Sequence, residues 1–395
     1  MTTTINNEHK KLNVPNLRFK EFQGEWEEYR IEDITENISS GRCKSHSSSG
    51  KYNLYGSTGI IGKTNEAYYE GNLVLVARVG ANAGSLQILN EPCGITDNTL
   101  IIKPKEVDAQ YIYYFLQHFN LNRLIFGSGQ PLITGGMLKK VKVSLGTIKE
   151  QNKITRLLSI LDDRITTQNK IIEDLKKLKS AIIEKVFCSP NKKNPMCRIE
   201  GFEQALSTYK MCDFSSRIAT KNKDSKCSLV LTIAAQYGLV NQESFFNKSV
   251  ASENLTGYYL LHKGEFAYNR SYSAGYDWGA VKRLDNYDEG VLSSLYICFK
   301  INETIVDSDY LAYYFESTKW HRGLSDIAGE GARNHGLLNV SITDYFNTKH
   351  RFPVIEEQKA IAKMLNTITE KERKATLLGE CYQKQKQYLL RQMFI

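Results

Sequence analysis

The stretch 147–187 reads TIKEQNKITRLLSILDDRITTQNKIIEDLKKLKSAIIEKVF, and a second stretch, 355–395, reads IEEQKAIAKMLNTITEKERKATLLGECYQKQKQYLLRQMFI. Neither stretch contains proline, and each has a Glu-Gln pair within its first turn. Apolar residues return in both at steps of four and three positions, which is the spacing of one face of an α-helix. The sequence therefore predicts two long amphipathic helices that are copies of each other.

The apolar faces of the two predicted helices share one frame. Stepping from Ile154 and from Ile361 gives equivalent positions at a constant separation of 207 (361 − 154). A seven-residue seam held along the whole stretch favours pairing of the two helices as a coiled coil. We expect the second helix to run back along the first, so the pair is antiparallel. The residues predicted to form this seam and to bind a partner helix are Ile154, Leu158, Leu161, Ile165, Ile172, Leu175, Ile182, Ile361, Leu365, Ile368 and Leu389.

The repetition extends to the residues that precede each helix. From Gly59 onward the separation of matched residues grows from 179 (238 − 59) to 207 (357 − 150), as expected for insertions in the second copy. The matched pairs are Arg18 and Arg198, Phe22 and Phe202, Tyr29 and Tyr209, Gly59 and Gly238, Gly71 and Gly264, the triplets Tyr113-Tyr114-Phe115 and Tyr313-Tyr314-Phe315 (313 − 113 = 200), and Glu150 and Glu357. The sequence therefore predicts a tandem duplication, far longer than a solenoid repeat.

Each copy is expected to be a globular α+β part followed by a long helix. Strand-like runs at 72–79, 99–102, 229–234 and 292–300, and short helices at 109–119 and 308–318, indicate a mixed α/β domain. The predicted limits are 14–146 and 197–354 for the two globular domains, and 147–187 and 355–395 for the two helices.

Composition narrows the class of protein. The chain has 395 residues, a hydrophobic fraction of 41% and a net charge of +9, and it contains no apolar run long enough to span a membrane. The polar start predicts a cytoplasmic protein with no signal peptide. Eight cysteines without a CxxC pair indicate neither a zinc site nor a disulfide framework. The two helices carry +6 of the charge (9 − 6 + 8 − 5), so charge permits DNA binding without demanding it.

Several phrases of the sequence resemble the recurring text of one known family. They are PNLRFKEFQGEWEEYRIEDI (15–34), LVLVARVGANAG (73–84), GSGQPLITGGMLKKVKV (127–143), KEQNKI (149–154) and PVIEEQKAIAKML (353–365). With the tandem repeat, the chain from Pro15 onward resembles the DNA-specificity subunits of type I restriction-modification systems.

This resemblance implies a non-catalytic, DNA-binding subunit. Each globular part would be a target recognition domain for one half of a split DNA sequence, and the helices would act as spacer and as docking surface. The implied partners are double-stranded DNA with a bipartite site, two methyltransferase subunits, and restriction subunits. No cofactor is expected on this chain; S-adenosylmethionine, ATP and Mg²⁺ would be bound by the partner subunits.

Candidate DNA contacts are polar residues in the glycine-rich turns of the two domains. Side chains of Arg, Asn, Gln, Ser and Thr read base edges, and small residues let the backbone approach a groove. The candidates in the first domain are Ser57, Thr58, Arg78, Asn82, Ser128, Gln130, Lys139 and Lys140. Those in the second domain are Gln236, Tyr237, Arg270, Tyr272, Tyr276, Arg333 and Asn334. Basic clusters predicted to position phosphates also include Arg42, Lys44 and Lys142, and Lys221, Lys223 and Lys226.

Two other function classes stay open at this stage. A coiled-coil adaptor that binds only proteins would explain the helices but not the turn pattern. A single-chain restriction-methylation enzyme would need catalytic domains for which the duplication leaves no room. The phrase STGIIGKT at 57–64 resembles a phosphate-binding loop, but Ser57 stands where that pattern requires glycine, and Gly71 interrupts the helix that should follow.

Overall fold

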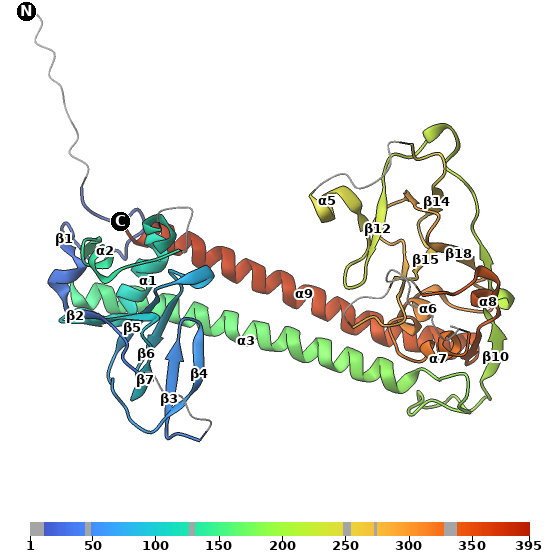
Figure 1. Ribbon diagram of the computed structural model, residues 1–395, viewed down its shortest axis with the longest axis horizontal. Helices are drawn as coiled ribbons and strands as arrows, with labels where there is room; N and C mark the ends of the chain where they lie inside the picture. The colour runs from blue at the N-terminus through green and yellow to red at the C-terminus, as the bar shows by residue number, and fades with distance from the viewer. Residues whose placement is uncertain (1–11, 44–48, 126–130, 248–253, 272–274, 328–337) are drawn as a thin grey trace, which may run out of the picture. The chain divides into compact units, whose positions relative to one another are not determined.

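The computed structural model describes residues 12–43, 49–125, 131–247, 254–271, 275–327 and 338–395 (Figure 1). Packing divides the chain into two compact units. Unit 1 contains Met1–Lys170 and Thr376–Ile395, and unit 2 contains Ile171–Ala375. The two long helices, α3 (Ile148–Val186) and α9 (Ile355–Met393), are each continuous across this division. Each unit therefore combines the first part of one helix with the last part of the other.

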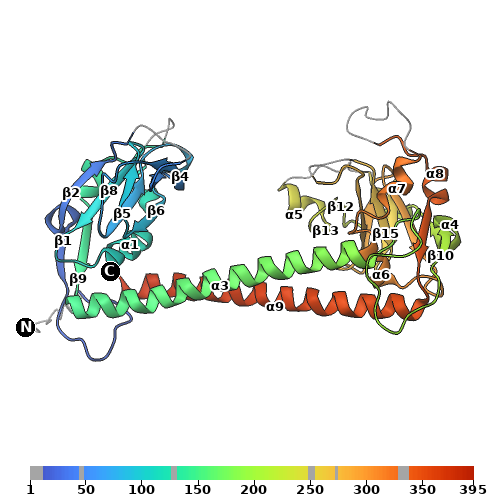
Figure 2. The ribbon, with the colours of Figure 1, turned by 90° about the horizontal axis from the view of Figure 1, so that it is seen from below.

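Unit 1 is built around a four-stranded sheet with the order β2-β8-β5-β6. All neighbouring strands in it are antiparallel, and the helix α1 (Ala109–Phe119) packs on β5 and β6. A second sheet, β4-β3-β7, carries a hairpin, and β1 pairs with β9 next to the start of α3 (Figure 2). The strands are β1 (Glu27–Arg30), β2 (Thr35–Ser40), β3 (Tyr52–Gly56), β4 (Gly59–Thr64), β5 (Leu73–Ala77), β6 (Leu86–Leu89), β7 (Cys93–Ile95), β8 (Thr99–Pro104) and β9 (Lys142–Leu145).

The remaining elements of unit 1 are short helical turns. They are η1 (Ile31–Ile34), η2 (Gly80–Asn82), η3 (Leu121–Leu124) and α2 (Gly135–Lys139).

Unit 2 repeats this architecture. Its four-stranded sheet has the order β11-β18-β15-β16, β12 and β13 form the hairpin, and β10 pairs with β19. The strands are β10 (Ser207–Lys210), β11 (Ser215–Arg217), β12 (Leu231–Ala234), β13 (Gly238–Asn241), β14 (Tyr259–His262), β15 (Phe266–Asn269), β16 (Ala280–Arg283), β17 (Glu289–Leu292), β18 (Ile297–Ile301) and β19 (Lys349–Phe352). The helical elements are α4 (Met211–Phe214), η4 (Lys223–Ser225), α5 (Gln242–Phe246), α6 (Ser308–Tyr314), α7 (His321–Ser325) and α8 (Ile342–Asn347).

The duplication predicted from the sequence is thus confirmed as a repeated topology. The long helices match residue for residue, since both run for 39 residues and start 207 positions apart (355 − 148). One predicted match was wrong by one position. Asp108 caps α1 and Asp307 caps α6, so these helices correspond at a separation of 199 (307 − 108), not 200, and Tyr114 corresponds to Tyr313.

Two expected elements end differently in the structure. The run 292–300 forms the end of β17 and most of β18, separated by a turn in which the Tyr296 amide donates to the Ser293 carbonyl. The helix expected at 308–318 ends at Tyr314, where Phe315 is its C-cap. Both differences are local turns, since the Phe315 amide likewise donates back to the Leu311 and Tyr313 carbonyls.

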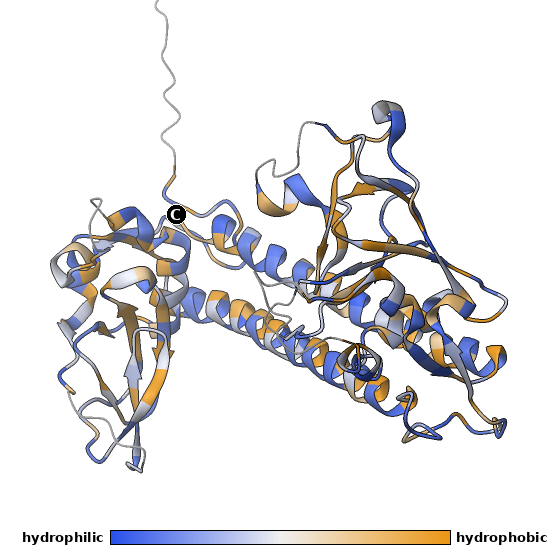
Figure 3. Ribbon diagram, turned by 45° about the vertical axis from the view of Figure 1, so that its right-hand side comes forward, coloured by the Kyte–Doolittle hydropathy of each residue, from blue (hydrophilic) through white to orange (hydrophobic). Residues whose placement is uncertain are grey.

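The helices pair antiparallel within each unit. In unit 1, Asp162 of α3 accepts from Lys386 of α9 at 2.6 Å, and Ile154 and Leu158 share a core with Leu389 and Met393. In unit 2, Lys179 of α3 pairs with Glu372 of α9 at 3.1 Å. Every predicted seam residue is buried or half-buried, and Figure 3 shows apolar and polar residues alternating along both helices. The described helices include none that is long and apolar enough to cross a membrane.

The last turn of each long helix completes the core of the other copy's domain. Phe394, just beyond α9, lies 5.0 Å from Tyr111 of α1 between ring centroids, and Phe187, just beyond α3, lies 5.0 Å from Tyr310 of α6. Both phenylalanines are nearly inaccessible to solvent, with 3% and 1% exposed. The end of the helix that follows one globular domain in the sequence therefore packs in the core of the other globular domain.

Burial of one histidine makes the stability of unit 2 depend on pH. His350 of β19 contacts the Tyr314 hydroxyl at 3.1 Å and the Thr348 hydroxyl at 2.9 Å, and burial lowers its pKa to about 3. The unfolded chain takes up a proton near pH 6.5, whereas the folded unit does not. As the pH falls from about 6.5 towards 3, unit 2 should lose up to about 1.4 kcal/mol of stability per pH unit.

The pH dependence of local hydrogen exchange in unit 2 measures this loss. Val143 of unit 1 occupies the position equivalent to His350 (350 − 143 = 207), so His350→Val provides the control. We expect the stability of unit 2 in the variant to depend less steeply on pH between about 6.5 and 3, whatever its stability at neutral pH. An unchanged slope in the variant would assign the acid sensitivity to other groups.

Candidate nucleic-acid interface

In unit 1, two of the predicted contacts, Ser57 and Arg78, meet at one backbone carbonyl. The Asn98 oxygen accepts from the Ser57 hydroxyl at 3.3 Å and from the Arg78 amide at 2.9 Å. Thr58 is exposed in the same β3–β4 turn, where Gly59 has a φ of +127°. The structure therefore brings together residues that lie far apart in the sequence, at the end of the hairpin and of the central strand β5.

Two buried polar atoms at this place have no hydrogen-bond partner among the described residues. They are Arg78 Nε and the Thr99 hydroxyl oxygen, and the register of the sheet pairs Ala77, next to Arg78, with Thr99. A buried donor without a partner costs about 1–3 kcal/mol, and a bound water or ligand is a common reason for one to persist. These two atoms are the polar groups of this site that the described residues leave available to a further partner.

Asn82 lies next to this site. It ends the short helix η2 and is exposed, and its carbonyl accepts from the Ser85 amide at 3.0 Å. Gly80, in the same turn, donates to the Pro131 carbonyl at 3.1 Å and has a φ of +79°, a conformation that favours glycine. This bond connects η2 to the segment that follows residues 126–130.

The two predicted lysines of unit 1 lie elsewhere. Lys139 is half-buried at the end of α2 and Lys140 is its exposed C-cap. The helix α2 packs on η1 and on β2, which begins at Thr35 directly after η1. The sheet register places Arg78 level with the other end of β2, near Ser40. These lysines therefore lie along β2 from the turn residues, because α2 carries the chain back along the sheet, and their contact with DNA stays a prediction.

In unit 2, the equivalent hairpin turn carries the predicted pair Gln236 and Tyr237. Both are exposed, Tyr237 by 68%. Tyr276, another predicted DNA contact, instead holds the backbone of this turn: its hydroxyl donates to the Ala235 carbonyl at 3.1 Å. The β12–β13 turn therefore presents different side chains from the β3–β4 turn on a similar backbone.

Arg270 follows β15 as Arg78 follows β5, but its guanidinium is engaged. Its terminal nitrogens donate to the Val340 and Leu295 carbonyls, both at 3.1 Å, and its backbone carbonyl accepts from Leu338 at 3.0 Å. Like Arg78, it has a buried Nε without a partner among the described residues. These bonds favour a role in holding two loops together over direct reading of a base.

Other predicted contacts cannot be placed. Ser128, Gln130, Tyr272, Arg333, Asn334 and Lys44 lie outside the described residues.

A basic loop of unit 2 contains residues that the sequence pattern did not single out. Asn222 is fully buried and both donates to and accepts from the Cys227 backbone, which closes the loop 222–227. Lys221 lies 3.8 Å above the Tyr259 ring, and Arg217 donates to the Tyr259 hydroxyl at 3.0 Å. Lys221 was already predicted as part of a basic cluster, but strand pairing between distant segments brings Tyr259 and Arg217 to it, and no local sequence signal could have indicated these partners.

The first turn of α3 explains the repeated Glu-Gln pair. Glu150 is 1% exposed and accepts from Arg18 through both oxygens, at 2.7 and 2.9 Å, and from the Trp26 indole at 3.1 Å. Glu357 of unit 2 accepts from Arg198 in the same way. The hydrogen bond to Glu150 raises the pKa of Arg18. A Cβ at Gly146 would lie 2.4 Å from Glu150 Oε2, so this position requires glycine.

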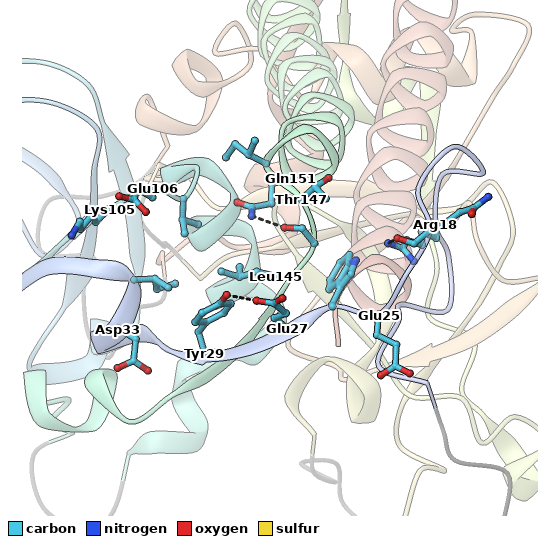
Figure 4. Close-up of a pocket in the computed structure, with 16 residues that line it drawn as sticks. Arg18, Glu25, Glu27, Tyr29, Asp33, Lys105, Glu106, Leu145, Thr147 and Gln151 are labelled. Carbon is cyan, nitrogen blue, oxygen red and sulfur yellow. Dashed lines mark hydrogen bonds between the residues drawn. The ribbon is translucent and has the colours of Figure 1, made fainter.

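An open pocket of about 430 Å³ lies beside this ion pair (Figure 4). Gln151 donates to the Gly146 carbonyl at 2.9 Å, and the Tyr29 hydroxyl donates to Glu27, which raises the pKa of Tyr29. The pocket is lined by several carboxylates, yet in the described part of the chain no three His, Cys, Asp or Glu residues are grouped to hold a metal ion. These contacts anchor the start of α3 and provide no recognisable catalytic group.

Comparison with known proteins identifies the family. The model of the type I restriction modification DNA specificity domain matches residues 23–177. The type I restriction enzyme MjaVIII specificity subunit of Methanocaldococcus jannaschii is 26% identical over 323 residues, which cover 75% of this chain and 72% of the relative. A protein of the same organism, described as a candidate MjaX specificity subunit, is 34% identical over 299 residues, covering 69% and 64% of the two chains.

Solved structures show the same fold. The type I restriction-modification S subunit from M. genitalium superposes with a TM-score of 0.61 at 16% identity, over 97% of this chain and 99% of the other. A chain from a structure of a type I restriction-modification system, described for complex assembly and conformational transition, gives 0.51 at 12% identity over 92% and 96%. Residues 23–177 of this chain therefore match a type I restriction modification DNA specificity domain, the relatives named above are type I specificity subunits, and the solved structures show that the chain shares their fold.

Proposed function

We propose that this specificity subunit binds a bipartite DNA target, each recognition domain contacting one half, and directs methyltransferase and restriction subunits to that target. The observation that carries the proposal is one scaffold with two different turns. The hairpins β3–β4 and β12–β13 occupy equivalent places, but one presents Ser57 and Thr58 and the other Gln236 and Tyr237. A duplicated backbone with different exposed polar side chains suits the recognition of two different base sequences.

Arg78 is the strongest single candidate for a base or phosphate contact in unit 1. Its Nε is buried without a partner among the described residues, and Ser57 and the Thr99 hydroxyl lie beside it. Arginine contacts guanine edges and phosphates through a fixed fork of donors. In the second domain, Arg217 and the lysines of the 221–226 loop supply positive charge suited to the DNA backbone.

The remaining parts of the proposal concern the partners. The subunit itself would bind no cofactor, and the methyltransferase subunits would supply S-adenosylmethionine while the restriction subunits would supply ATP and Mg²⁺. Because the start of each long helix is anchored by the same Arg-Glu pair, each unit offers an equivalent surface, which suits two copies of one methyltransferase subunit. The complex would act on cellular DNA in the cytoplasm.

Exchanging one recognition domain tests the proposal. Replacing residues 14–146 by the corresponding domain of another specificity subunit should change one half of the methylated target and leave the other half unchanged. Methylome sequencing of cells that express the chain with its methyltransferase subunit measures both halves at once. A continuous target, or a change in both halves, would contradict the proposal.

Salt dependence separates this proposal from a protein-only adaptor. If the chain contacts phosphates, the affinity of its complex for target duplex should fall steeply and linearly in log-log form as salt rises. An adaptor would show no such retention on DNA. The salt dependence of DNA affinity therefore distinguishes a DNA-binding subunit from an adaptor, without knowledge of the individual base contacts.

A further inference from the structure

Three aromatic side chains are exposed together at the β12–β13 hairpin of unit 2. Tyr237 is 68% exposed, and Phe245 and Phe246 of α5 are 46% and 45% exposed. The rings of Tyr237 and Phe245 are 6.4 Å apart between centroids, and those of Phe245 and Phe246 are 5.0 Å apart at 84°. We refer to these three residues as the aromatic turn. Neighbouring exposed rings of this size usually mark a binding surface.

The local structure holds the aromatic turn in place. Gly238 has a φ of +87°, which allows the tight reversal after Tyr237. The Asn241 side chain accepts from the amides of Glu243 and Ser244, at 2.9 and 3.3 Å, and so starts α5 directly after β13 (Figure 1). With the bond from Tyr276 to Ala235, these contacts fix the backbone on both sides of the rings. A preorganised surface loses little conformational entropy when it binds a ligand.

The charge of the segment indicates which part of a nucleic acid the rings contact. Residues 235–247 contain no Lys or Arg and one acidic residue, Glu243, so this segment itself supplies no positive charge for a phosphate. Aromatic rings stack on bases whatever their sequence, and apolar wedges enter base steps. Gln236, exposed next to Tyr237, can donate to and accept from a base edge. The turn also matches the place in unit 1 where Ser57 and Arg78 gather.

We propose that the aromatic turn enters a base step of the half-site bound by unit 2, with Tyr237 stacking on a base and Phe245 and Phe246 supporting it. This inference rests on the proposed DNA-reading function and adds a mode of recognition to it. Unit 1 has no aromatic residue in its equivalent turn, where Ser57 and Thr58 stand. The two domains therefore contact DNA differently, one through polar groups and the other also by unstacking a base.

Fluorescence of 2-aminopurine tests the proposal in the complete complex of this chain with its methyltransferase subunits. The probe replaces adenines one at a time in a duplex that carries the target found by methylome sequencing. Besides the adenines that the methyltransferase subunits flip, we expect the unaltered complex to raise the fluorescence at one further step, in the half-site bound by unit 2. Tyr237→Ala and Phe245→Leu should abolish this rise and weaken binding by about 5- to 100-fold. Tyr237→Phe should keep both, because the ring and not the hydroxyl makes the contact.

The slope of log Kd against log salt distinguishes stacking from charge. It should stay the same in the ring variants, since none of them removes a phosphate contact. Met196, which is 73% exposed outside the aromatic turn, provides the control Met196→Ala, for which no change is expected. The exposed positions should also leave the thermal stability of unit 2 unchanged, which shows that the variants are folded.

The possible outcomes separate the inference from the function on which it rests. If the unaltered complex does not prefer its target duplex, the proposed function itself fails. If it binds its target but the ring variants bind and fluoresce as it does, the inference is wrong. Loss of affinity in Tyr237→Phe would assign the contact to the hydroxyl, and loss of the methyltransferase subunit from the ring variants would assign the surface to a protein. Either result would also overturn stacking.

Discussion

Replacing Phe394 by alanine is expected to destabilise unit 1 by about 3–5 kcal/mol, the usual cost of removing a buried phenylalanine side chain. The residue is 3% exposed and packs on Tyr111, Phe115 and His118, with centroid distances of 5.0, 6.5 and 5.9 Å. The effect should therefore be felt in a domain most of whose core residues lie more than two hundred positions earlier in the chain. Hydrogen exchange followed by mass spectrometry should show faster exchange in α1 and unchanged exchange in α6.

The neighbouring residue provides the control for this prediction. Ile395 is 45% exposed, so Ile395→Ala should change the stability by no more than about 0.5 kcal/mol. Phe187→Ala provides the reciprocal variant, because Phe187 packs on Tyr310 and Tyr314 at 5.0 and 5.7 Å and should loosen α6 and not α1. Faster exchange in α6 after Phe394→Ala would contradict the reciprocal packing.

Replacing Glu150 by glutamine should also destabilise unit 1, by about 3 kcal/mol. The change keeps the size of the side chain but leaves the guanidinium of Arg18, whose side chain is 16% exposed, without its paired charge. Removing one partner of a buried ion pair typically costs about 3–5 kcal/mol, and the partial exposure of Arg18 favours the lower end. Chemical denaturation measures the loss of stability. Faster amide hydrogen exchange in residues 12–34 and in the first turn of α3 would show where the loss occurs.

An exposed pair in the same unit provides the control. Arg30 and Glu32 are 3.4 Å apart with side chains 59% and 39% exposed, so Glu32→Gln should cost at most about 1 kcal/mol. Glu357→Gln should act on unit 2 as Glu150→Gln acts on unit 1, because Arg198 binds Glu357 with the same two-pronged geometry. Equal effects of Glu150→Gln and Glu32→Gln would show that burial adds nothing to the strength of the pair.

The helix pairing could be predicted because its signal is local and periodic. The positions stepped from Ile154 and Ile361 are buried or half-buried all along α3 and α9. The repeated Glu-Gln pair was visible in the sequence, but its partners were not. Glu150 binds Arg18, which lies 132 positions away, and the side-chain oxygen of Gln151 accepts from the Asp108 amide at 3.4 Å. The sequence shows that the Glu-Gln pair is repeated, whereas only the fold shows which residues it binds.

The candidate DNA contacts were predicted less completely. Residue type and turn position led to Ser57, Thr58 and Arg78, which the fold does bring together. The same reasoning could not give the position of Lys139 and Lys140 relative to these turns, because it could not follow the path of α2 along the sheet. It also treated Arg270 like Arg78, although backbone carbonyls of distant loops occupy the guanidinium of Arg270. Which donors are engaged depends on partners that no local pattern specifies.

The sequence by itself determined the duplication, the two long helices and their common frame, because helical periodicity and repetition are properties of the chain read in order. Only the tertiary structure decided which helix end completes which domain, with Phe394 in the core of unit 1 and Phe187 in that of unit 2. It also decided which polar groups of the β3–β4 and β12–β13 turns are free of hydrogen bonds within the protein. Both depend on contacts between residues far apart in the chain, where burial and hydrogen bonding select one arrangement among many that the same local pattern allows.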